Sequence, residues 1–362
     1  MPSHNAQADT AQTSSSTPPR PKLPTWLVCV VVLLLQLGFI LSFVGAFHAP
    51  HPHRIPVTVV GSPPVAQKIA GDLNRLDGAP VRAVAATDLG AARDDLGHGR
   101  TSGVLVPDQT SDSDTLLIAS AGGTSVGTAL TKTIGAVDRA RGRTVSVTDA
   151  VPLQSGDGNG LTGFYLVVGW IIGGYLLAAV LGVLQGAKPA GPAAAARRLL
   201  VFVPYALASG ILGAVVVGPV LGALHGDLLL LTAIGALTVM ASAATTIALQ
   251  TIFGIVGIAI TIVIFVILGN PSAGGAYQAS LLPPFWRAIS SAIPNGAGTD
   301  AVRKSVYFAG TAIGPNIWTL VAYITVGVLI TLVVSYRSST RGNPPADHDA
   351  AQPDRALAAP ST

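Results

Sequence analysis

Long apolar runs recur along the chain and predict helices that cross a membrane. About 20 apolar residues in a helix span the roughly 30 Å hydrocarbon core of a bilayer. The run at 228–269 is about twice that length, and we interpret it as two crossings joined by a tight turn near 246–251. The pattern therefore predicts six spans, in runs at 26–47, 164–184, 199–221, 228–269 and 317–336.

The first run predicts transmembrane helix 1 over residues 25–47, preceded by Arg20 and Lys22. Two interpretations compete, a cleaved signal peptide and an uncleaved signal anchor. The apolar core of a signal peptide is normally about 7–15 residues long, and this run is longer. The length favours an anchor that stays in the protein.

Residues 48–160 alternate between short β-branched runs and amphipathic stretches of helical period. Asp88 stands where it would cap one of the helices. This alternation predicts a small α/β domain of the βαβ type. Strands are expected at 55–60, 81–85, 103–107, 115–119 and 144–147, and helices at 64–76, 88–96 and 124–137.

Composition agrees with a membrane protein. Half of the residues are hydrophobic, only 10% are charged and the mean hydropathy is +0.58, whereas soluble domains carry roughly 25% charged residues. More than half of the formal charges lie in 48–160. We therefore predict a polytopic α-helical membrane protein with six transmembrane helices, an extracytoplasmic α/β domain between helices 1 and 2, and a five-helix block at 161–336.

The charge distribution predicts the orientation. Cytoplasmic loops of membrane proteins are enriched in Lys and Arg, and the short loop 222–227 on the opposite side has neither. Both termini are therefore expected in the cytoplasm. The segments 1–24 and 337–362 are rich in small and polar residues and are expected to be disordered tails. The basic residues concerned are Arg20, Lys22, Lys188, Arg197, Arg198, Arg337, Arg341 and Arg355.

The net charge of +4 and the pI of about 9.4 do not indicate a nucleic-acid partner. Binding to nucleic acid needs basic clusters within a polar surface. Here the basic residues stand at the ends of apolar runs. The expected surroundings are a lipid bilayer.

Two short patterns resemble catalytic signatures. Residues 158–163 fit G-x-G-x-x-G, but they open a membrane span instead of following a strand in a βαβ unit. Residues 123–127 fit G-x-S-x-G, and Ser125 with His98 and an Asp could form a hydrolase triad, although Thr124 and Ser125 are also natural helix caps. No G-x-x-x-x-G-K-[ST] phosphate loop occurs. We expect no enzyme, and a hydrolase using Ser125 is the third alternative.

Metal and cofactor binding are not expected. Cys29 is the only cysteine, which excludes an intramolecular disulfide and a multi-cysteine metal site. His48, His51 and His53 are weak candidates for Zn²⁺ or Cu²⁺. The prolines between them make the segment extended, and the spacing fits no closed structural site. A stiff linker is the favoured interpretation.

The predicted spans contain no Asp, Glu, Lys, Arg or His. Ion-coupled carriers usually keep such groups at mid-membrane, so the pattern argues against one. G-x-x-x-G spacings at 169–173 and 218–222 allow helix backbones to pack closely. They predict packing within the bundle, with dimerisation as the alternative.

The loop 270–316 is the expected functional surface. Its stretches 282–287 and 299–308 are amphipathic and aromatic, and residues 293–296 separate them. We predict two short helices at, or dipping into, the outer membrane interface, with Trp286, Tyr307 and Phe308 at headgroup depth. Irregular backbone at that depth must be covered by protein or face water.

Several motifs follow the order of one span, an outer α/β domain and five further spans. They lie at 103–107 and 118–122, in Asn270-Pro271-Ser272-Ala273-Gly274-Gly275, in Leu282-Pro283-Pro284-Phe285-Trp286, and at 293–297 and 300–303. In this order and these motifs the chain resembles the type-2 ATP-binding-cassette (ABC) permeases, within them the YhgE/phage-infection-protein (Pip) group. The resemblance covers roughly residues 25–336. The outer domain of this chain is shorter than in the long phage-infection proteins, and the loop 185–198 leaves little room for the helix that docks an ATPase.

The resemblance implies a homodimeric, exporter-like bundle in a bacterial plasma membrane. It implies an export permease subunit that moves a hydrophobic or amphiphilic substrate outward, with a separate ATP-hydrolysing subunit as a further partner. The alternative is a non-transporting envelope protein whose outer domain binds a secretion component, a phage or another partner. Candidate substrate-path or interface residues are Asn270, Pro271, Gly274, Gly275, Pro284, Trp286, Arg287 and Arg303.

Overall fold

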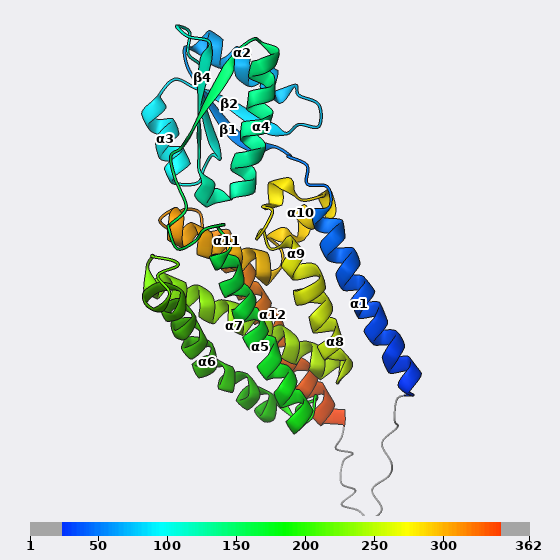
Figure 1. The fold of residues 1–362 in the computed structure, drawn as a ribbon. Coiled ribbons are helices and arrows are strands. Elements are labelled where there is room, and N and C mark those ends of the chain that lie inside the picture. The colour runs from blue at the N-terminus through cyan, green and yellow to red at the C-terminus, as the bar shows by residue number, and fades with distance from the viewer. Residues whose placement is uncertain (1–23, 342–362) are drawn as a thin grey trace, which may run out of the picture.

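A computed structural model of the chain describes residues 24–341 (Figure 1). Within them, five helices are long and apolar enough to cross a membrane. The chain is therefore a multi-pass helical membrane protein that also contains a five-stranded sheet. The five helices are α1 (Thr25–Phe47), α5 (Thr162–Gln185), α6 (Pro192–Val215), α7 (Leu228–Phe253) and α12 (Gly314–Arg341).

The predicted tails lie almost wholly outside the described residues. The exceptions are Pro24, which precedes α1, and residues 337–341. The prediction of a disordered tail from 337 is wrong for these five positions, because α12 continues through them to Arg341.

The double-length run contains α7 and a second, shorter apolar helix, Val256–Ser272. The second helix comprises α8 (Val256–Ile262), the π-helical segment η3 (Val263–Gly269) and α9 (Asn270–Ser272). The turn between them lies at Gly254, which has φ +64°, so the predicted turn at 246–251 is wrong. Thr246 and Thr251 are instead buried in α7 and donate to carbonyls four residues back. Gly254 tolerates the left-handed backbone that ends the helix.

α7 is the centre of the bundle and packs against α5, α6, α8 and α12. Small residues permit this close approach. A Cβ at Gly174 of α5 would collide with Ser242 Oγ, and one at Gly327 of α12 would lie 2.7 Å from the carbonyl carbon of Ala244. Of the predicted spacing at 169–173, Gly173 faces Tyr205 within the bundle, whereas Gly169 meets open space. After α6 the chain continues into a second π-helical segment, η2 (Val216–Val220).

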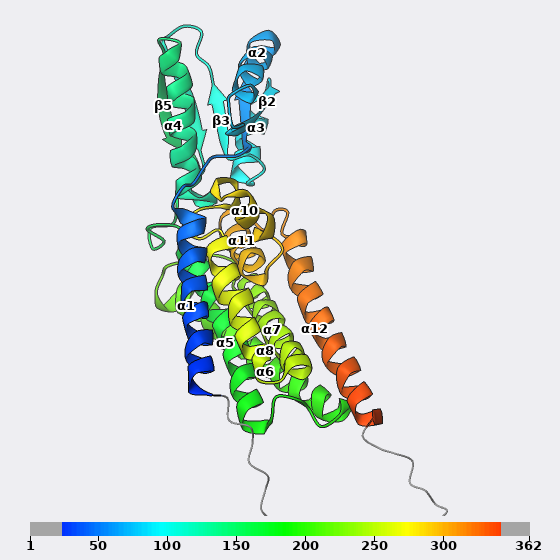
Figure 2. The same cartoon turned by 90° about the vertical axis from the view of Figure 1, so that its right-hand side faces the viewer.

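α1 lies at the edge of the bundle, and most of its side chains are exposed (Figures 1 and 2). Only Ser42 and Ala46 are buried. The hydroxyl of Ser42 donates to the carbonyl of Ile267 in η3. This bond fastens α1 to the helix of residues 256–272.

The α/β domain is a mixed sheet in the order β2-β1-β3-β4-β5, in which only β3 and β4 are antiparallel. Its helices α2 and α4 cover one face through a core that contains Leu73, Leu105 and Leu130. α3 covers the other face through Leu96. The elements are β1 (Ile55–Val60), α2 (Pro63–Asn74), β2 (Val81–Ala86), α3 (Leu89–Gly97), β3 (Gly103–Val106), β4 (Ser113–Ile118), η1 (Ser120–Gly122), α4 (Thr124–Ala140) and β5 (Thr144–Asp149).

All five strands and three helices of this domain lie where the sequence predicts them, with ends that differ by a few residues. The predicted cap of α3 is also confirmed. The carboxylate of Asp88 accepts the N–H groups of Gly90 and Ala91, at 2.7 and 3.3 Å. A side-chain acceptor here pairs amide hydrogens that have no partner inside the helix.

Three short helices lie between the α/β domain and the bundle: η4 (Ala279–Leu281), α10 (Pro284–Ser290) and α11 (Pro294–Tyr307). The loop thus contains short helices, but residues 293–296 do not separate them as predicted, because Pro294 begins α11. Proline is favoured there, since the first helical N–H needs no partner. Phe308 is 5% exposed and lies against Gly99 and Gly122 of the α/β domain, so it is a buried packing residue. Its place at headgroup depth stays a prediction.

Candidate functional site

A polar cavity of about 270 Å³ lies where the α/β domain meets the bundle. We call it the junction cavity. Segments far apart in the sequence build its wall, from the start of β3 to the first turn of α12. Its lining residues are Ser102, Gly122, Val126, Ala273, Gly274, Gln278, Ala279, Ser280, Ser290, Ser291, Gly296, Asp300, Arg303 and Asn316.

Pro271 lies in α9, two residues before the cavity residue Ala273. Proline has no N–H, so the carbonyl four residues earlier, that of Ile267, loses its helical donor. The Ser42 hydroxyl donates to this carbonyl. One turn away, Asn295 Nδ2 donates to Phe265 O at 3.0 Å and to Asn270 Oδ1 at 2.8 Å. The Asn-Pro pair therefore connects α1, η3 and the first turn of α11.

Arg303 is the cation at the cavity wall. Its Nη2 donates to Gly274 O at 2.8 Å, and Gly274 has φ +75°. Burial lowers the pKa of the Arg303 guanidinium, while the charges of Asp300 and Asp157 raise it. Asp157 also accepts the hydroxyl of Tyr307 at 2.7 Å, which joins the segment before α5 to α11.

A neutral network lies beside Arg303. Lys304 Nζ is 2.8 Å from Asp300 Oδ2 and 3.0 Å from Asn316 Oδ1. Asn316 Nδ2 donates to the same Asp300 oxygen at 3.1 Å. Two cations, Arg303 and Lys304, and two carboxylates, Asp300 and Asp157, balance in this region. The cavity therefore suits a polar group, and Arg303 is the cationic donor in its wall.

The structure brings together only some of the predicted site residues. Gly274 and Arg303 line the junction cavity, whereas Asn270 and the buried Pro271 do not. Gly275 packs against Phe164, where a Cβ would come within 2.7 Å of the ring.

The predicted residues Pro284, Trp286 and Arg287 lie on α10 and do not line this cavity. A Cβ at Gly45 of α1 would lie 4.0 Å from Trp286 Nε1. Burial lowers the pKa of His53, and the positive charges of Arg287 and Arg54 lower it further. α10 therefore faces α1 and the linker after it.

Sequence reasoning missed Asn316, Gln278 and the serines of the wall. Asn316 is 6% exposed at the start of an apolar helix. A polar amide at the start of an apolar run is visible in the sequence, so Asn316 could have been found there. Gln278 and the serines carry no such signal.

The three histidines after α1 do not converge. The backbone N–H groups of His51 and His53 donate to Leu281 O and Ser280 O, at 3.1 and 2.8 Å. His48 Nδ1 lies 2.9 Å from Val44 O. Across residues 24–341, no three His, Cys, Asp or Glu side chains form a group that could hold a metal ion. The segment is a linker whose backbone pairs with η4.

The hydrolase alternative lacks its geometry. Ser125 Oγ donates to Ala276 O at 2.5 Å. His98 pairs with Asp94 on α3. α3 and α4 cover opposite faces of the sheet, so Ser125 and His98 do not form a catalytic pair. Residues 158–163 form a loop into α5, where Asp157 accepts the N–H of Thr162 at 3.0 Å.

A second, apolar groove of about 250 Å³ lies between α7 and α12. Its α7 residues fall in the second half of that helix, away from the α/β domain. We call it the lipid-side groove. Its walls are formed by Thr245, Ala248, Leu249, Ile252, Ala322, Tyr323, Val326, Gly327 and Ile330.

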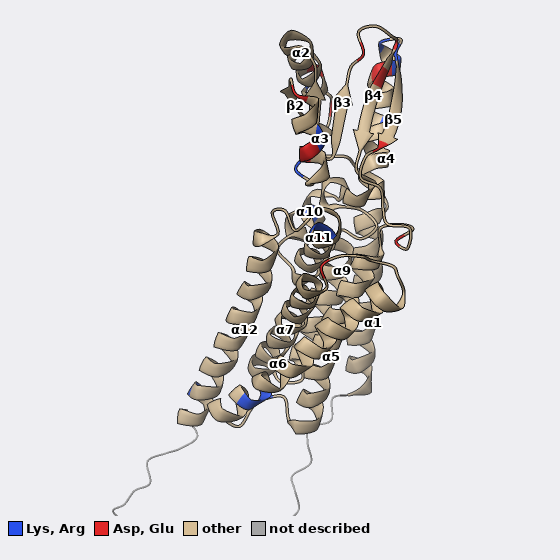
Figure 3. Cartoon of the chain, turned by 90° about the vertical axis from the view of Figure 1, so that its left-hand side faces the viewer, with Lys and Arg blue, Asp and Glu red and all other residues tan. Residues whose placement is uncertain are grey.

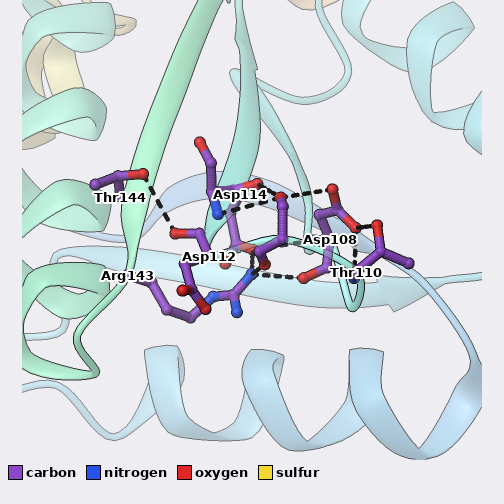
Figure 4. Close-up of polar contacts among 8 residues, drawn as sticks. Asp108, Thr110, Asp112, Asp114, Arg143 and Thr144 are labelled. Atoms are coloured by element: carbon purple, nitrogen blue, oxygen red, sulfur yellow. Dashed lines mark hydrogen bonds and ion pairs between the residues drawn. The ribbon is translucent and has the colours of Figure 1, made fainter.

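A charged cluster fixes the tip of the α/β domain (Figure 4). Arg143 Nη2 donates to the backbone carbonyls of Asp108 and Ser111 and to the carboxylate of Asp114. Hydrogen bonds lower the pKa of Asp108 to about 2. The largest contribution comes from the hydroxyl of Ser111, followed by the N–H and the hydroxyl of Thr110. Arg143 forms an ion pair with Asp114, and the Asp108 carboxylate accepts from Thr110 and Ser111. These bonds hold the loop before β4 against the start of β5.

Asp138 lies nearby on α4 and is 1% exposed. Its Oδ2 has no hydrogen-bond partner among the described residues. Burial raises the pKa of Asp138 to about 6, and the negative charge of Asp114 is the second cause. A buried carboxyl without a partner prefers its neutral form.

Fold and site thus define a multi-pass membrane protein that carries an α/β domain over a polar cavity at one end of its bundle. Comparison with protein-family models, with curated proteins and with solved structures finds no match.

Proposed function

We propose that this protein is a permease-like export subunit of a bacterial plasma membrane that moves an amphiphilic substrate outward. In this proposal the α/β domain lies outside, both termini lie in the cytoplasm, and Val256–Ser272 provides a sixth crossing. The resemblance to type-2 ABC permeases further suggests a homodimer and a separate ATP-hydrolysing subunit.

The observation that carries the proposal is a pair of sites of opposite character on one helix. Asn316, in the first turn of α12, lines the junction cavity with Arg303. Further along α12, Tyr323 and Ile330 line the lipid-side groove. An amphiphile has a polar head and an apolar chain, and these two sites match the two parts.

The sidedness is supported by the charges. Figure 3 shows basic residues and no acidic ones at the end of the bundle far from the α/β domain. An excess of Lys and Arg is typical of the cytoplasmic side. The α5–α6 connection there, residues 186–191, contains no helix of its own, so an ATPase would need a further surface to dock.

Efflux from cells that express the full chain tests the proposal. The probe is a dansylated fatty acid, an anionic amphiphile, with a dansylated alkylammonium as its cationic counterpart. We expect Arg303→Gln to slow efflux of the anionic probe by about tenfold, since the headgroup loses its charged partner. Arg303→Lys should recover part of the rate.

Arg287→Gln is the matched control, because Arg287 belongs to the same connecting segment but lies outside the cavity. It should keep the wild-type rate. Thermal unfolding of each purified variant verifies that it is folded. A folded Arg303→Gln protein with wild-type efflux, or no efflux by any form, would overturn the proposal in favour of an envelope protein that binds a partner.

A further inference from the structure

A pocket of about 440 Å³ opens at the far end of the bundle, between α5 and α6. It is distinct from the junction cavity and the lipid-side groove. We call it the basic pocket. Its lining includes three cationic side chains, Lys188, Arg197 and Arg198, and apolar ones such as Leu181, Ala194 and Val201.

Arg198 is a fixed part of this pocket. Arg198 is only 7% exposed. Its Nη2 and Nη1 donate to Gly186 O and Ala187 O, at 2.8 and 3.3 Å. These carbonyls follow α5 directly, so Arg198 closes the connection between the two helices. A guanidinium has five N–H donors, and two carbonyls do not use them all.

The positive charge of the pocket has no balancing carboxylate in the part of the chain that the structure describes. Within residues 24–341, none of the three cations forms an ion pair with a carboxylate. Between residues 161 and 299 the sequence has one acidic residue, Asp227. Asp227 caps the start of α7 near the α/β domain, at the opposite end. Among residues 24–341, no carboxylate supplies the counter-charge, so the pocket is suited to an anion that binds there.

The walls indicate what that molecule is. Lys188 and Arg197 are exposed at the rim. Val201 is 54% exposed one turn further into the bundle. An anion that touches all of these has a charged head at the membrane surface and an apolar chain below it. One arginine guanidinium can donate two parallel N–H bonds to two oxygens of a phosphate.

We infer that the basic pocket binds the phosphate of an anionic phospholipid, with one acyl chain along Leu181 and Val201. Each basic side chain near a membrane surface contributes about 1 kcal/mol to such binding. Removing the two rim charges should therefore weaken binding by about 30-fold. Lys188 also lies near the α7–α8 turn, because its Cε is 3.9 Å from the Cβ position of Gly254. The bound lipid should therefore stabilise three helices together.

The test uses the purified full chain in a neutral detergent. Binding of dioleoylphosphatidylglycerol is titrated by native mass spectrometry, and thermal unfolding is followed in parallel. Dioleoylphosphatidylcholine tests the need for net charge, and glycerol phosphate tests the need for acyl chains. The variant is Lys188→Gln with Arg197→Gln, two exposed changes that leave Arg198 in place. The control is Arg337→Gln, an exposed arginine on α12 outside the pocket.

We expect phosphatidylglycerol to bind the wild type and the Arg337→Gln control with equal affinity and to raise their melting temperatures. The double variant should bind about 30-fold more weakly. Three outcomes would overturn the inference. These are equal binding by the double variant, equal stabilisation by glycerol phosphate, which would mean a soluble-anion site, and displacement of the lipid by a co-purifying ATPase, which would mean a docking surface for protein.

Discussion

The α/β domain and the helical bundle contain buried polar groups of different kinds. The domain buries carboxyl groups. Asp114 is paired with Arg143, whereas Asp138 has no such partner and its pKa is raised. The bundle and α11 at its end use neutral amides and hydroxyls, such as Asn295 and Thr246. Its charges lie at its two ends (Figure 3). A bilayer makes an interior charge costly, whereas a hydrated domain can neutralise one by protonation.

The largest expected effect concerns the amide that joins α11 to η3. Asn295→Leu removes the donor to Phe265 O, which stays buried, and to Asn270 Oδ1, which is partly buried. Unpaired buried groups are costly, so we expect a loss of about 3 kcal/mol in the free energy of unfolding. Denaturant titration in detergent measures it, with the exposed Gln185→Ala as control. A loss no larger than that of the control would show that neutral amides do not stabilise the bundle.

The second prediction concerns the protonated carboxyl of the domain. The pKa of Asp138 is about 6 in the folded protein and 3.8 ordinarily, so between these values the folded state retains a proton that the unfolded chain releases. The stability of the wild type should therefore fall as pH rises from about 4 to about 6. Asp138→Asn should remove this dependence and be more stable by about 2 kcal/mol at pH 7.

Thermal unfolding of the full chain between pH 4 and pH 7 measures this slope. The exposed Asp77→Asn is the control and should keep it. A variant at Asp138 with the wild-type slope would mean that this carboxyl is already ionised in the folded domain, and the contrast between the two regions would then be lost.

The smallest expected effect is at the edge of the bundle. Ser42→Ala removes the hydroxyl that donates to Ile267 O. Hydrogen bonds between membrane helices are typically worth about 1 kcal/mol or less. We expect a loss of that size and faster amide hydrogen exchange in α1. The control is Gln36→Ala, an exposed change on the same helix, and equal exchange rates in the two variants would show that other contacts hold α1.

The sequence predicts the α/β domain well because each of its elements depends on a local pattern. Asp88 and the alternating apolar residues determine the ends of α3 and the faces of the strands without reference to distant segments. The cap and the strands could therefore be found from neighbouring residues alone.

The junction could be predicted only in part, because long-range contacts decide it. Pro294 and Asn295 resemble a turn in sequence, yet Asn295 finds its partners in η3, and the segment is the first turn of a buried helix. Phe308 is apolar and aromatic like a membrane anchor, but its ring packs against Gly99 and Gly122 of the α/β domain. The turn after α7 lies later than predicted because Gly254 supplies the positive-φ backbone that ends the helix.

The central claim is that the hydrated α/β domain lies outside the membrane and the basic end of the bundle lies inside. Labelling of intact cells with a membrane-impermeant maleimide tests it most directly, in chains that carry Cys29→Ser and either Asp77→Cys in the domain or Arg337→Cys on α12. We predict that Asp77→Cys is labelled in intact cells and that Arg337→Cys is labelled only after the cells are opened. Labelling of Arg337→Cys but not Asp77→Cys in intact cells would contradict the claim.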